Sequence, residues 1–319
     1  MTEHSKHPAH IWWNGKFVAW DDATIHVTEL GWSTVGAVFE GIRAYANPSS
    51  DQGIVIFRLQ EHLTRLKKSM ALVRLRLDYS LPELTEIIVE LLRMNEVRED
   101  TYIRPLAYTA NVAGKRFSEV GGEAGLLINT SRMPSHLKTG VTQTAAVSSW
   151  RRISDEVMPP RIKNLSNYRN GQLANMEARA NGYDVGILLN TGGTVAEAPG
   201  ACVMFVADGK LITPHVTSSI LESITRDALM VLAREVLGLE VIERAVDRTE
   251  LYLADEVFTC GTAAEITPIT EIDKYQIGDG RQGPISRDLE HAFHEVLRGQ
   301  DPRYRHWSTP VHAAAPVLA

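Results

Sequence analysis

The sequence has little cysteine, no long apolar run and no excess of basic residues, and each absence excludes a class of protein. Its 319 residues include two cysteines, Cys202 and Cys260, too few for a disulfide framework or a zinc knuckle. No run of about 18 apolar residues occurs, so no membrane-spanning helix is expected. The formal net charge is −6, without the overall basicity typical of nucleic-acid-binding proteins. We therefore expect a soluble, cytoplasmic protein that binds neither membranes nor nucleic acid.

Several familiar enzyme motifs are also missing. The chain has no P-loop, GxGxxG, HExxH or GxSxG, which disfavours phosphoryl transfer, NAD binding, zinc proteolysis and serine hydrolysis. His291 and His294 share one face of an expected helix, but no third ligand is evident near them. We therefore expect no metal site.

Hydrophobic patterning predicts two domains of mixed helices and strands, an α+β or α/β fold without a regular βαβ rhythm. Asn14-Gly15 between two apolar runs predicts a hairpin, and Ser80 with Glu83 predicts a capped helix. The expected ranges are a small N-terminal α/β domain at 1–130, an interdomain linker at 131–142, a large C-terminal α/β domain at 143–300 and a loose tail at 301–319.

The same patterning predicts individual elements. The expected helices, besides the one that Ser80 caps, are Leu59–Val73, Gln172–Asn181, Ile224–Leu237 and Pro284–Leu297. The expected strands are Gly36–Tyr45, Gly53–Phe57, Tyr102–Ala110, Ala124–Thr130, and the hairpin pairs Val185–Asn190 with Thr194–Glu197 and Cys202–Ala207 with Lys210–Thr213.

Four segments carry groups that together suit pyridoxal phosphate. Lys163 lies in an extended, partly apolar segment, where burial would lower the pKa of its amine and favour a Schiff base. Glu197 ends an expected strand and is suited to hold a proton on a ring nitrogen. The helix start at 219–227 and the turn at 260–268 offer backbone N–H groups to anions. Each segment also has a simpler interpretation, respectively a surface lysine, a solvated glutamate, an ordinary helix cap and an ordinary turn.

Longer segments resemble the branched-chain aminotransferase family of fold-type IV, class IV pyridoxal phosphate enzymes. The strongest are Val38–Arg43, Tyr102–Leu106, Leu251–Val257 and Cys260–Pro268, within a similarity that runs from Ile11 to Leu297. The resemblance implies a D-amino acid aminotransferase-like fold, pyridoxal 5′-phosphate as cofactor, a role in branched-chain amino acid biosynthesis, and a homodimer or higher homo-oligomer.

The resemblance also implies roles for individual residues. Lys163 would hold the cofactor covalently and move the substrate proton, while Glu197 would pair with the pyridine nitrogen and Tyr168 would face the phenolate oxygen. Leu221 would pack on the ring. The phosphate contacts would come from Arg65, Ser223, Ile224, Thr225 and Thr262. The substrate contacts would come from Phe39, Gly41, Tyr102, Arg104, Thr262 and Ala263.

Three positions depart from the family pattern. Thr34-Val35 replaces an aromatic-Gly pair, which removes a pocket tyrosine, although Trp32 is close enough in sequence to fill some of the space. Cys202 replaces an asparagine, and Ser223 replaces a glycine at the phosphate helix. The linker is short and lacks a tyrosine that often covers the pocket. These departures leave the expected cofactor site complete but alter the substrate site.

We therefore expect a transaminase that moves the amino group of a branched-chain L-amino acid to 2-oxoglutarate in two half-reactions. The altered pocket keeps open a broader hydrophobic amino acid, an (R)-amine or a D-amino acid as the donor. A lyase of the same fold, such as one acting on aminodeoxychorismate, is the alternative from another reaction class.

Overall fold

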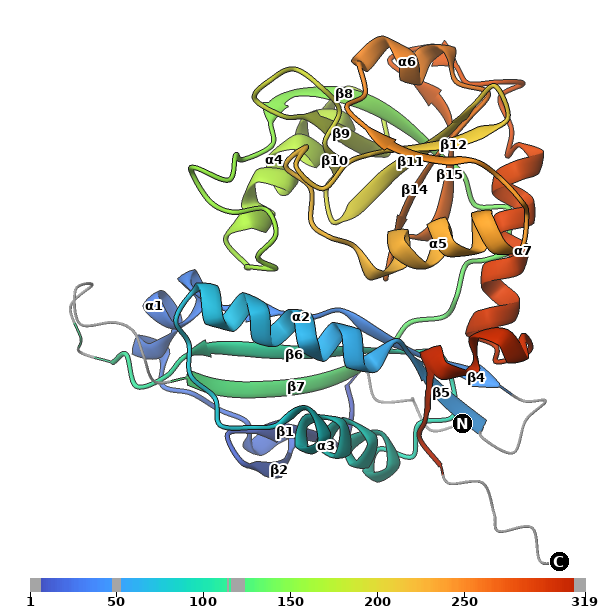
Figure 1. Cartoon of the computed structure of the whole chain (residues 1–319). Helices are drawn as coiled ribbons and strands as arrows, with labels where there is room; N and C mark the ends of the chain where they lie inside the picture. Colours follow the sequence, from blue (N-terminus) through green and yellow to red (C-terminus); the bar gives the residue numbers. More distant parts are fainter. Residues whose placement is uncertain (1–6, 48–52, 114, 116–123, 313–319) are drawn as a thin grey trace, which may run out of the picture. The chain divides into compact units, whose positions relative to one another are not determined.

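The computed structural model describes residues 7–47, 53–113, 115 and 124–312. The chain forms two compact units, each built on its own sheet (Figure 1). The first unit contains the chain up to Ser135, the short segment Lys163–Ser166, and the chain from Glu295 onward. The second contains His136–Ile162 and Asn167–His294. Helices and strands alternate irregularly in both, which confirms the expected fold of mixed helices and strands.

The described part of the first unit contains an eight-stranded sheet with the strand order β17-β5-β4-β6-β7-β1-β2, and β3 pairs with β6. Its elements are β1 (His10–Trp13), β2 (Lys16–Ala19), α1 (Leu30–Val35), β3 (Val38–Phe39), β4 (Ile42–Asn47), β5 (Gly53–Phe57), α2 (Leu59–Leu72), α3 (Leu81–Met94), β6 (Thr101–Thr109), β7 (Ala124–Arg132) and β17 (Ser308–Pro310). Helices α2 and α3 contribute Leu63 and Ile88 to a core that also contains Ile42, Ile54 and Ile128 of the strands.

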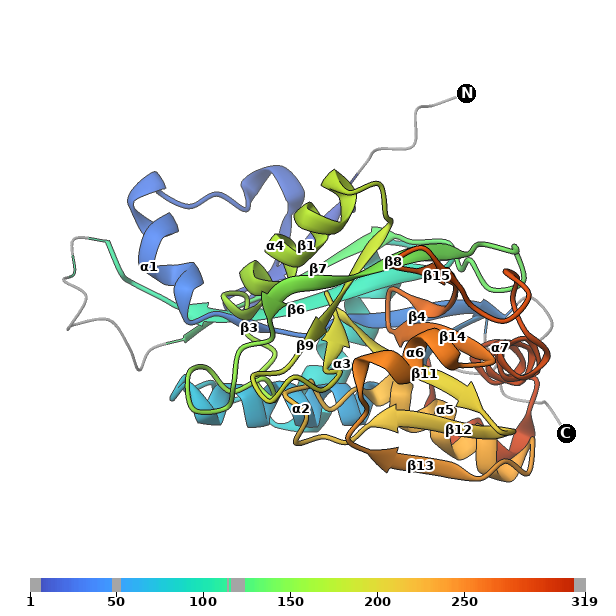
Figure 2. The same ribbon diagram turned by 90° about the horizontal axis from the view of Figure 1, so that it is seen from above.

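The described part of the second unit contains a nine-stranded sheet with the order β13-β12-β11-β14-β15-β8-β9; β10 pairs with β11 and β16 with β15. Its elements are β8 (Gln143–Arg151), α4 (Asn167–Ala180), β9 (Val185–Leu189), β10 (Glu197–Ala198), β11 (Ala201–Ala207), β12 (Lys210–Pro214), α5 (Ile224–Glu235), β13 (Val241–Arg244), α6 (Arg248–Leu253), β14 (Glu256–Gly261), β15 (Glu265–Ile272), β16 (Tyr275–Gln276) and most of α7 (Pro284–Leu297). Figure 2 shows β11, β12 and β13 side by side in this sheet.

Local sequence signals produced the elements that they predicted. The turn between β1 and β2 has positive φ angles at both Asn14 (45°) and Gly15 (97°), as its sequence requires. Ser80 and Glu83 form the expected capping box of α3. The expected strand from Gly36 is present as β3 and β4, which pair with β6 in one register and are separated at Glu40-Gly41.

The expectation of a loose tail is wrong for residues 301–312. Pro302–Trp307 form a 3₁₀ helix, and β17 pairs antiparallel with β5. Tyr304, Trp307 and Val311 are buried. A 3₁₀ helix and a three-residue strand are too short to produce a periodic pattern, so this packing leaves no signal in the sequence. No helix in the described ranges is long and apolar enough to cross a bilayer.

Candidate active site

The residues expected at the active site fall into two sets, one in each unit. The first unit contains Phe39, Gly41, Arg65, Tyr102, Arg104 and Lys163. The second contains Tyr168, Glu197, Leu221, Ser223, Ile224, Thr225, Thr262 and Ala263.

Lys163 is half-buried and lies in a short extended segment rather than in the expected strand. Its carbonyl accepts a hydrogen bond from the backbone N–H of Phe39 (2.9 Å), and its own N–H donates to Oγ of Ser69 (3.3 Å). A single bridge between Val38 and Asn164 completes the pairing. Nζ lies 5.0 Å from the centre of the Phe39 ring. The backbone of Lys163 is therefore fixed by β3 and α2.

Arg65 lies on α2 and forms a bidentate ion pair with Glu40. Its Nε and Nη2 donate to the two carboxylate oxygens of Glu40 over 2.7 and 2.8 Å. Nδ1 of His62, one turn earlier on α2, lies 2.8 Å from the same carboxylate. The sequence analysis missed Glu40 and His62, although Glu40 stands inside the segment Val38–Arg43 that carries the family resemblance.

Gly41 and Tyr102 are in direct contact on neighbouring strands. A Cβ added to Gly41 would overlap the Tyr102 hydroxyl and lie 2.9 Å from Cζ, so this position requires a glycine. Arg104 follows two residues after Tyr102 on β6, so both side chains leave the same face of the strand. Three of the expected substrate contacts therefore lie in one region of the first sheet.

Glu197 is buried on β10, and protein donors bind both of its carboxylate oxygens. Nε of Arg152 donates to Oε1 over 2.7 Å, and the backbone N–H of Leu221 donates to Oε2 over 3.0 Å. The sequence analysis missed Arg152, which follows β8 and is itself buried. A buried carboxylate held by a guanidinium stays ionised, as an acceptor for a ring N–H must be.

Cys202 faces Glu197 across the pairing of β10 with β11. Its Sγ donates to the Leu221 carbonyl over 3.7 Å. On its other side Cys202 pairs with Cys260 of β14. Burial, followed by the neighbouring Cys202, raises the pKa of the Cys260 thiol well above its ordinary value. The cysteine at this departure from the family pattern therefore supports Leu221 and Glu197 as a small buried side chain.

The expected phosphate residues stand at the start of α5. Oγ of Ser223 accepts a hydrogen bond from the Arg226 N–H (3.2 Å), which makes Ser223 the N-cap. Ile224 and Thr225, the first two helical residues, are buried. Arg226 is also buried and anchors the helix start, donating to Oγ1 of Thr213 and to other acceptors. The first N–H groups of such a helix suit an anion.

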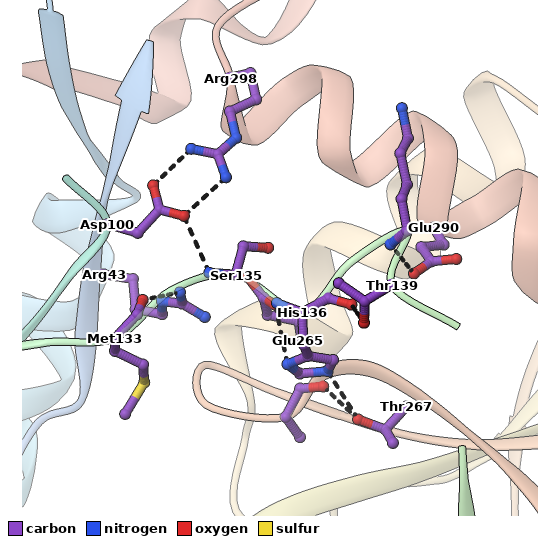
Figure 3. A network of polar contacts seen from close by, with 12 residues as sticks. Arg43, Asp100, Met133, Ser135, His136, Thr139, Glu265, Thr267, Glu290 and Arg298 are labelled. Atoms are coloured by element: carbon purple, nitrogen blue, oxygen red, sulfur yellow. Dashed lines mark hydrogen bonds and ion pairs between the residues drawn. The ribbon is translucent and has the colours of Figure 1, made fainter. Parts of the chain in front are cut away.

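The turn at residues 262–264 connects β14 and β15 and contains Thr262 and Ala263. The next residue, Glu265, has a left-handed φ of 45° and is fully buried. Its carboxylate accepts the His136 N–H (2.9 Å), and Thr267 bonds both the Ala264 carbonyl (2.7 Å) and the His136 ring (3.1 Å), as Figure 3 shows for the contacts of His136. These contacts brace the turn from behind.

Tyr168 is the second residue of α4. Its ring lies beside Gly200, where an added Cβ would be 3.6 Å from Cε1 of the ring. Gly200 is in the turn between β10 and β11, so Tyr168 lies near the strand that carries Glu197. Within the described residues, no group of histidine, cysteine and acidic side chains is arranged to hold a metal ion.

Figure 3 also shows a polar contact of the first unit that lies apart from these residues. The Asp100 carboxylate binds the Arg298 guanidinium over 2.5 and 2.8 Å and accepts the Ser135 N–H over 3.0 Å. The first unit thus contains a second arginine–carboxylate pair of similar geometry, which serves as a comparison for Arg65 and Glu40.

Comparisons with known proteins agree with this arrangement. Residues 37–272 match the sequence profile of amino-transferase class IV. A probable branched-chain-amino-acid aminotransferase of Aquifex aeolicus is 42% identical over 299 residues, which are 93% of this chain and 95% of that protein. The structure of a branched-chain amino acid aminotransferase from Thermobaculum terrenum in its PLP form is 50% identical with a TM-score of 0.93, covering 97% and 100% of the two chains. That of the T.th. enzyme complexed with N-(5′-phosphopyridoxyl)-L-glutamate is 38% identical with a TM-score of 0.87, covering 96% and 99%.

Proposed function

Because the chain belongs to the class IV amino-transferase family, we propose that it transfers the amino group of branched-chain L-amino acids to 2-oxoglutarate. It is an aminotransferase of fold-type IV, and its cofactor is pyridoxal phosphate. The observation that carries the proposal is the extent of similarity: relatives named branched-chain aminotransferases match more than nine-tenths of the chain. Structures of the T.th. enzyme contain a phosphopyridoxyl-glutamate and the branched 4-methylvaleric acid, which support both substrates.

The donor set of the described residues fits this cofactor. An aldehyde requires an amine, which Lys163 supplies, and a pyridine N–H requires an ionised acceptor such as Glu197. A phosphate requires N–H donors and positive charge, which the start of α5 and Arg65 supply. Each unit therefore supplies part of the proposed contacts, and no required type of group is missing from them.

The cofactor, when bound, supplies an electron sink for the bond that breaks at the substrate Cα. Nζ of Lys163 holds it covalently, and after substrate binding takes the proton from Cα and returns it. Glu197 keeps the proton on the ring nitrogen, and Tyr168 donates to the phenolate oxygen. Leu221 packs against the ring. The phosphate is held by Arg65, Ser223, Ile224, Thr225 and Thr262.

The substrate is recognised at both ends. N–H groups of the turn that contains Thr262 and Ala263 bind the α-carboxylate. Phe39, Gly41 and Tyr102 line the space for an apolar side chain, and Arg104 binds the distal carboxylate of glutamate. Arg104 is exposed, which suits a residue that must accept and release a charged group in each cycle.

We also propose that the chain acts as a homodimer in the cytoplasm. The segment between β2 and β3 exposes an unusual number of large apolar side chains: Ile25, Val27, Leu30, Trp32 and Val35. Contiguous exposed apolar residues suit a protein interface, and a second copy is the partner that the family resemblance implies. Both cysteines are free thiols, which suits a reducing compartment. Light scattering of the purified protein tests the dimer; a monomer at micromolar concentration would refute it.

The first experiment is a visible absorption spectrum of the purified protein before and after addition of L-leucine without an acceptor. We expect the band of the aldehyde form of the cofactor to be replaced by that of pyridoxamine phosphate, and 2-oxoglutarate to restore it. A cofactor band that ignores L-leucine would refute the substrate assignment, and (R)-1-phenylethylamine and D-alanine would be tried next. A lyase is distinguished by product formation without any 2-oxo acid acceptor.

A further inference from the structure

Glu40, His62 and Arg65 form a buried cluster in the first unit. The Glu40 side chain is 0% exposed, that of His62 2% and that of Arg65 12%. The Glu40 carboxylate accepts hydrogen bonds from Arg65 through both of its oxygens and lies 2.8 Å from Nδ1 of His62. Burying a carboxylate so completely is unfavourable unless it is paired, so these contacts hold the cluster together.

The charge states within the cluster follow from the contacts. Burial alone would raise the pKa of Glu40, but the charge and hydrogen bonds of Arg65, with the hydrogen bond of His62, lower it to about 2. Burial lowers the pKa of His62 below its ordinary value. Near neutral pH the carboxylate is therefore ionised and the imidazole is neutral. Because an ionised carboxylate only accepts hydrogen bonds, we assign the proton of neutral His62 to Nδ1.

The cluster is also connected to the segment that carries Lys163. Phe39, directly before Glu40, donates its backbone N–H to the Lys163 carbonyl. Ser69, which follows Arg65 by one helical turn on α2, accepts the Lys163 N–H. The dipeptide Phe39-Glu40 therefore contacts Lys163 through its backbone and Arg65 through its carboxylate.

We propose that Glu40 and His62 are positioning residues for the cofactor phosphate, acting by holding the Arg65 guanidinium in one orientation relative to Lys163. The inference rests on the proposed role of Arg65 in binding that phosphate. A bidentate carboxylate fixes the plane of a guanidinium, so the remaining N–H donors point in a set direction. His62 in turn fixes the carboxylate. Orientation fixed before binding lowers the entropic cost of binding the phosphate.

A competing expectation has the opposite sign. If Glu40 acted only through its charge, it would partly neutralise Arg65 and weaken the attraction for a phosphate. Removing that charge would then strengthen cofactor binding. The two effects are separated by the change from Glu40 to glutamine, which keeps the size of the side chain and removes its charge.

The experiment measures the dissociation constants of pyridoxal phosphate and of pyridoxal, which lacks the phosphate, for the full chain freed of cofactor. For Glu40→Gln we expect the dissociation constant of pyridoxal phosphate to rise at least about tenfold, because a charged hydrogen-bonded partner of Arg65 is lost. The dissociation constant of pyridoxal is expected to change less than about threefold. Asp100→Asn is the matched control, because it disrupts the Arg298 pair of the same unit, and we expect both constants to stay at their wild-type values.

His62 provides a second variant for the case that Glu40→Gln does not fold. His62→Gln retains an N–H donor toward Glu40 and is expected to keep most of the affinity for pyridoxal phosphate, whereas His62→Phe loses it selectively. Equal weakening of both ligands, or unchanged or tighter binding of pyridoxal phosphate, would overturn the proposal. Arg65→Met separately tests the proposed role of Arg65: if it leaves the preference for pyridoxal phosphate over pyridoxal intact, that role fails, and the inference fails with it.

Discussion

Nε of Arg152 lies 2.7 Å from Oε1 of Glu197, and the two side chains are 9% and 7% exposed. Arg152→Met leaves this buried carboxylate without its charged partner, which costs about 3–5 kcal/mol or drives Glu197 to take up a proton. Protonated Glu197 no longer stabilises a protonated ring nitrogen. We therefore expect kcat to fall at least about tenfold, measured with L-leucine and 2-oxoglutarate.

Arg298→Met is the control for Arg152, because it breaks the comparable pair with Asp100 in the first unit. We expect it to lower thermal stability and leave kcat unchanged. Wild-type turnover in a folded Arg152→Met protein would show that Glu197 does not need this partner.

Lys163→Ala is expected to abolish turnover, because no other amine then holds the cofactor or moves the proton at Cα. The absorption band of the covalently held cofactor should disappear as well, and both are measured on the same sample. Lys210→Ala is the control, since Nζ of Lys210 makes an exposed ion pair with Glu240 that contributes little. Residual full activity in Lys163→Ala would refute the assignment.

Gly41→Ala is expected to displace the Tyr102 ring, because the added Cβ overlaps its hydroxyl. Overpacking of this kind costs about 1–3 kcal/mol, so kcat/KM for L-leucine should fall about fivefold or more. Tyr102→Phe in the same chain removes the overlapping oxygen and should restore part of the activity. Gly31→Ala in α1 meets no atom within 4 Å and should have no effect; equal losses in both glycine variants would contradict the explanation.

The neutral state of His62 predicts a pH dependence of stability. Its pKa is lowered by burial in the folded protein, so below its ordinary value of 6.5 the unfolded chain binds a proton that the folded chain does not. The free energy of unfolding should therefore decrease as the pH falls from 7 toward 5, with a slope of up to about 1.4 kcal/mol per pH unit from this group. Urea unfolding should show a smaller decrease for His62→Gln, and an identical slope would contradict the prediction.

Glu265 is expected to act on substrate binding through the turn that it follows. Glu265→Gln weakens the hydrogen bond to the His136 N–H, so the turn at 262–264 becomes less rigid. KM for 2-oxoglutarate should rise about fivefold, with a smaller change in kcat. Glu271→Gln on the same strand is the control, because its ion pair with Lys274 is at the surface. A change in kcat alone would argue against a role in binding.

The sequence predicted those parts of the fold that short-range chemistry determines. Asn14-Gly15 requires two positive φ angles, and the Ser80–Glu83 box joins residues three positions apart, so both signals are complete within a few residues. The strand expected at Lys163 was wrong for the opposite reason. Its pairing partner, Val38, lies in a distant part of the chain and provides a single bridge.

The partners of the site residues were missed because they are not local. A charged residue such as Arg152 or Glu40 has the sequence appearance of any surface charge, and only the folded chain brings it to Glu197 or to Arg65. His62 lies one helical turn before Arg65, which was a usable signal, but the acceptor that they share lies on another element. The roles of Lys163, Glu197 and the remaining site residues stay predictions that the variants above test.

The first unit is assembled from three separate stretches of chain, and this affects how the protein can be made or divided. Its edge strand β17 comes from residues 308–310, which are among the last to leave the ribosome, and Lys163–Ser166 arrive in the middle of synthesis. The N-terminal 135 residues therefore emerge without the strand that covers β5. A gene fragment that ends at the boundary between the units encodes an incomplete sheet, and the two halves cannot be exchanged between relatives as independent cassettes.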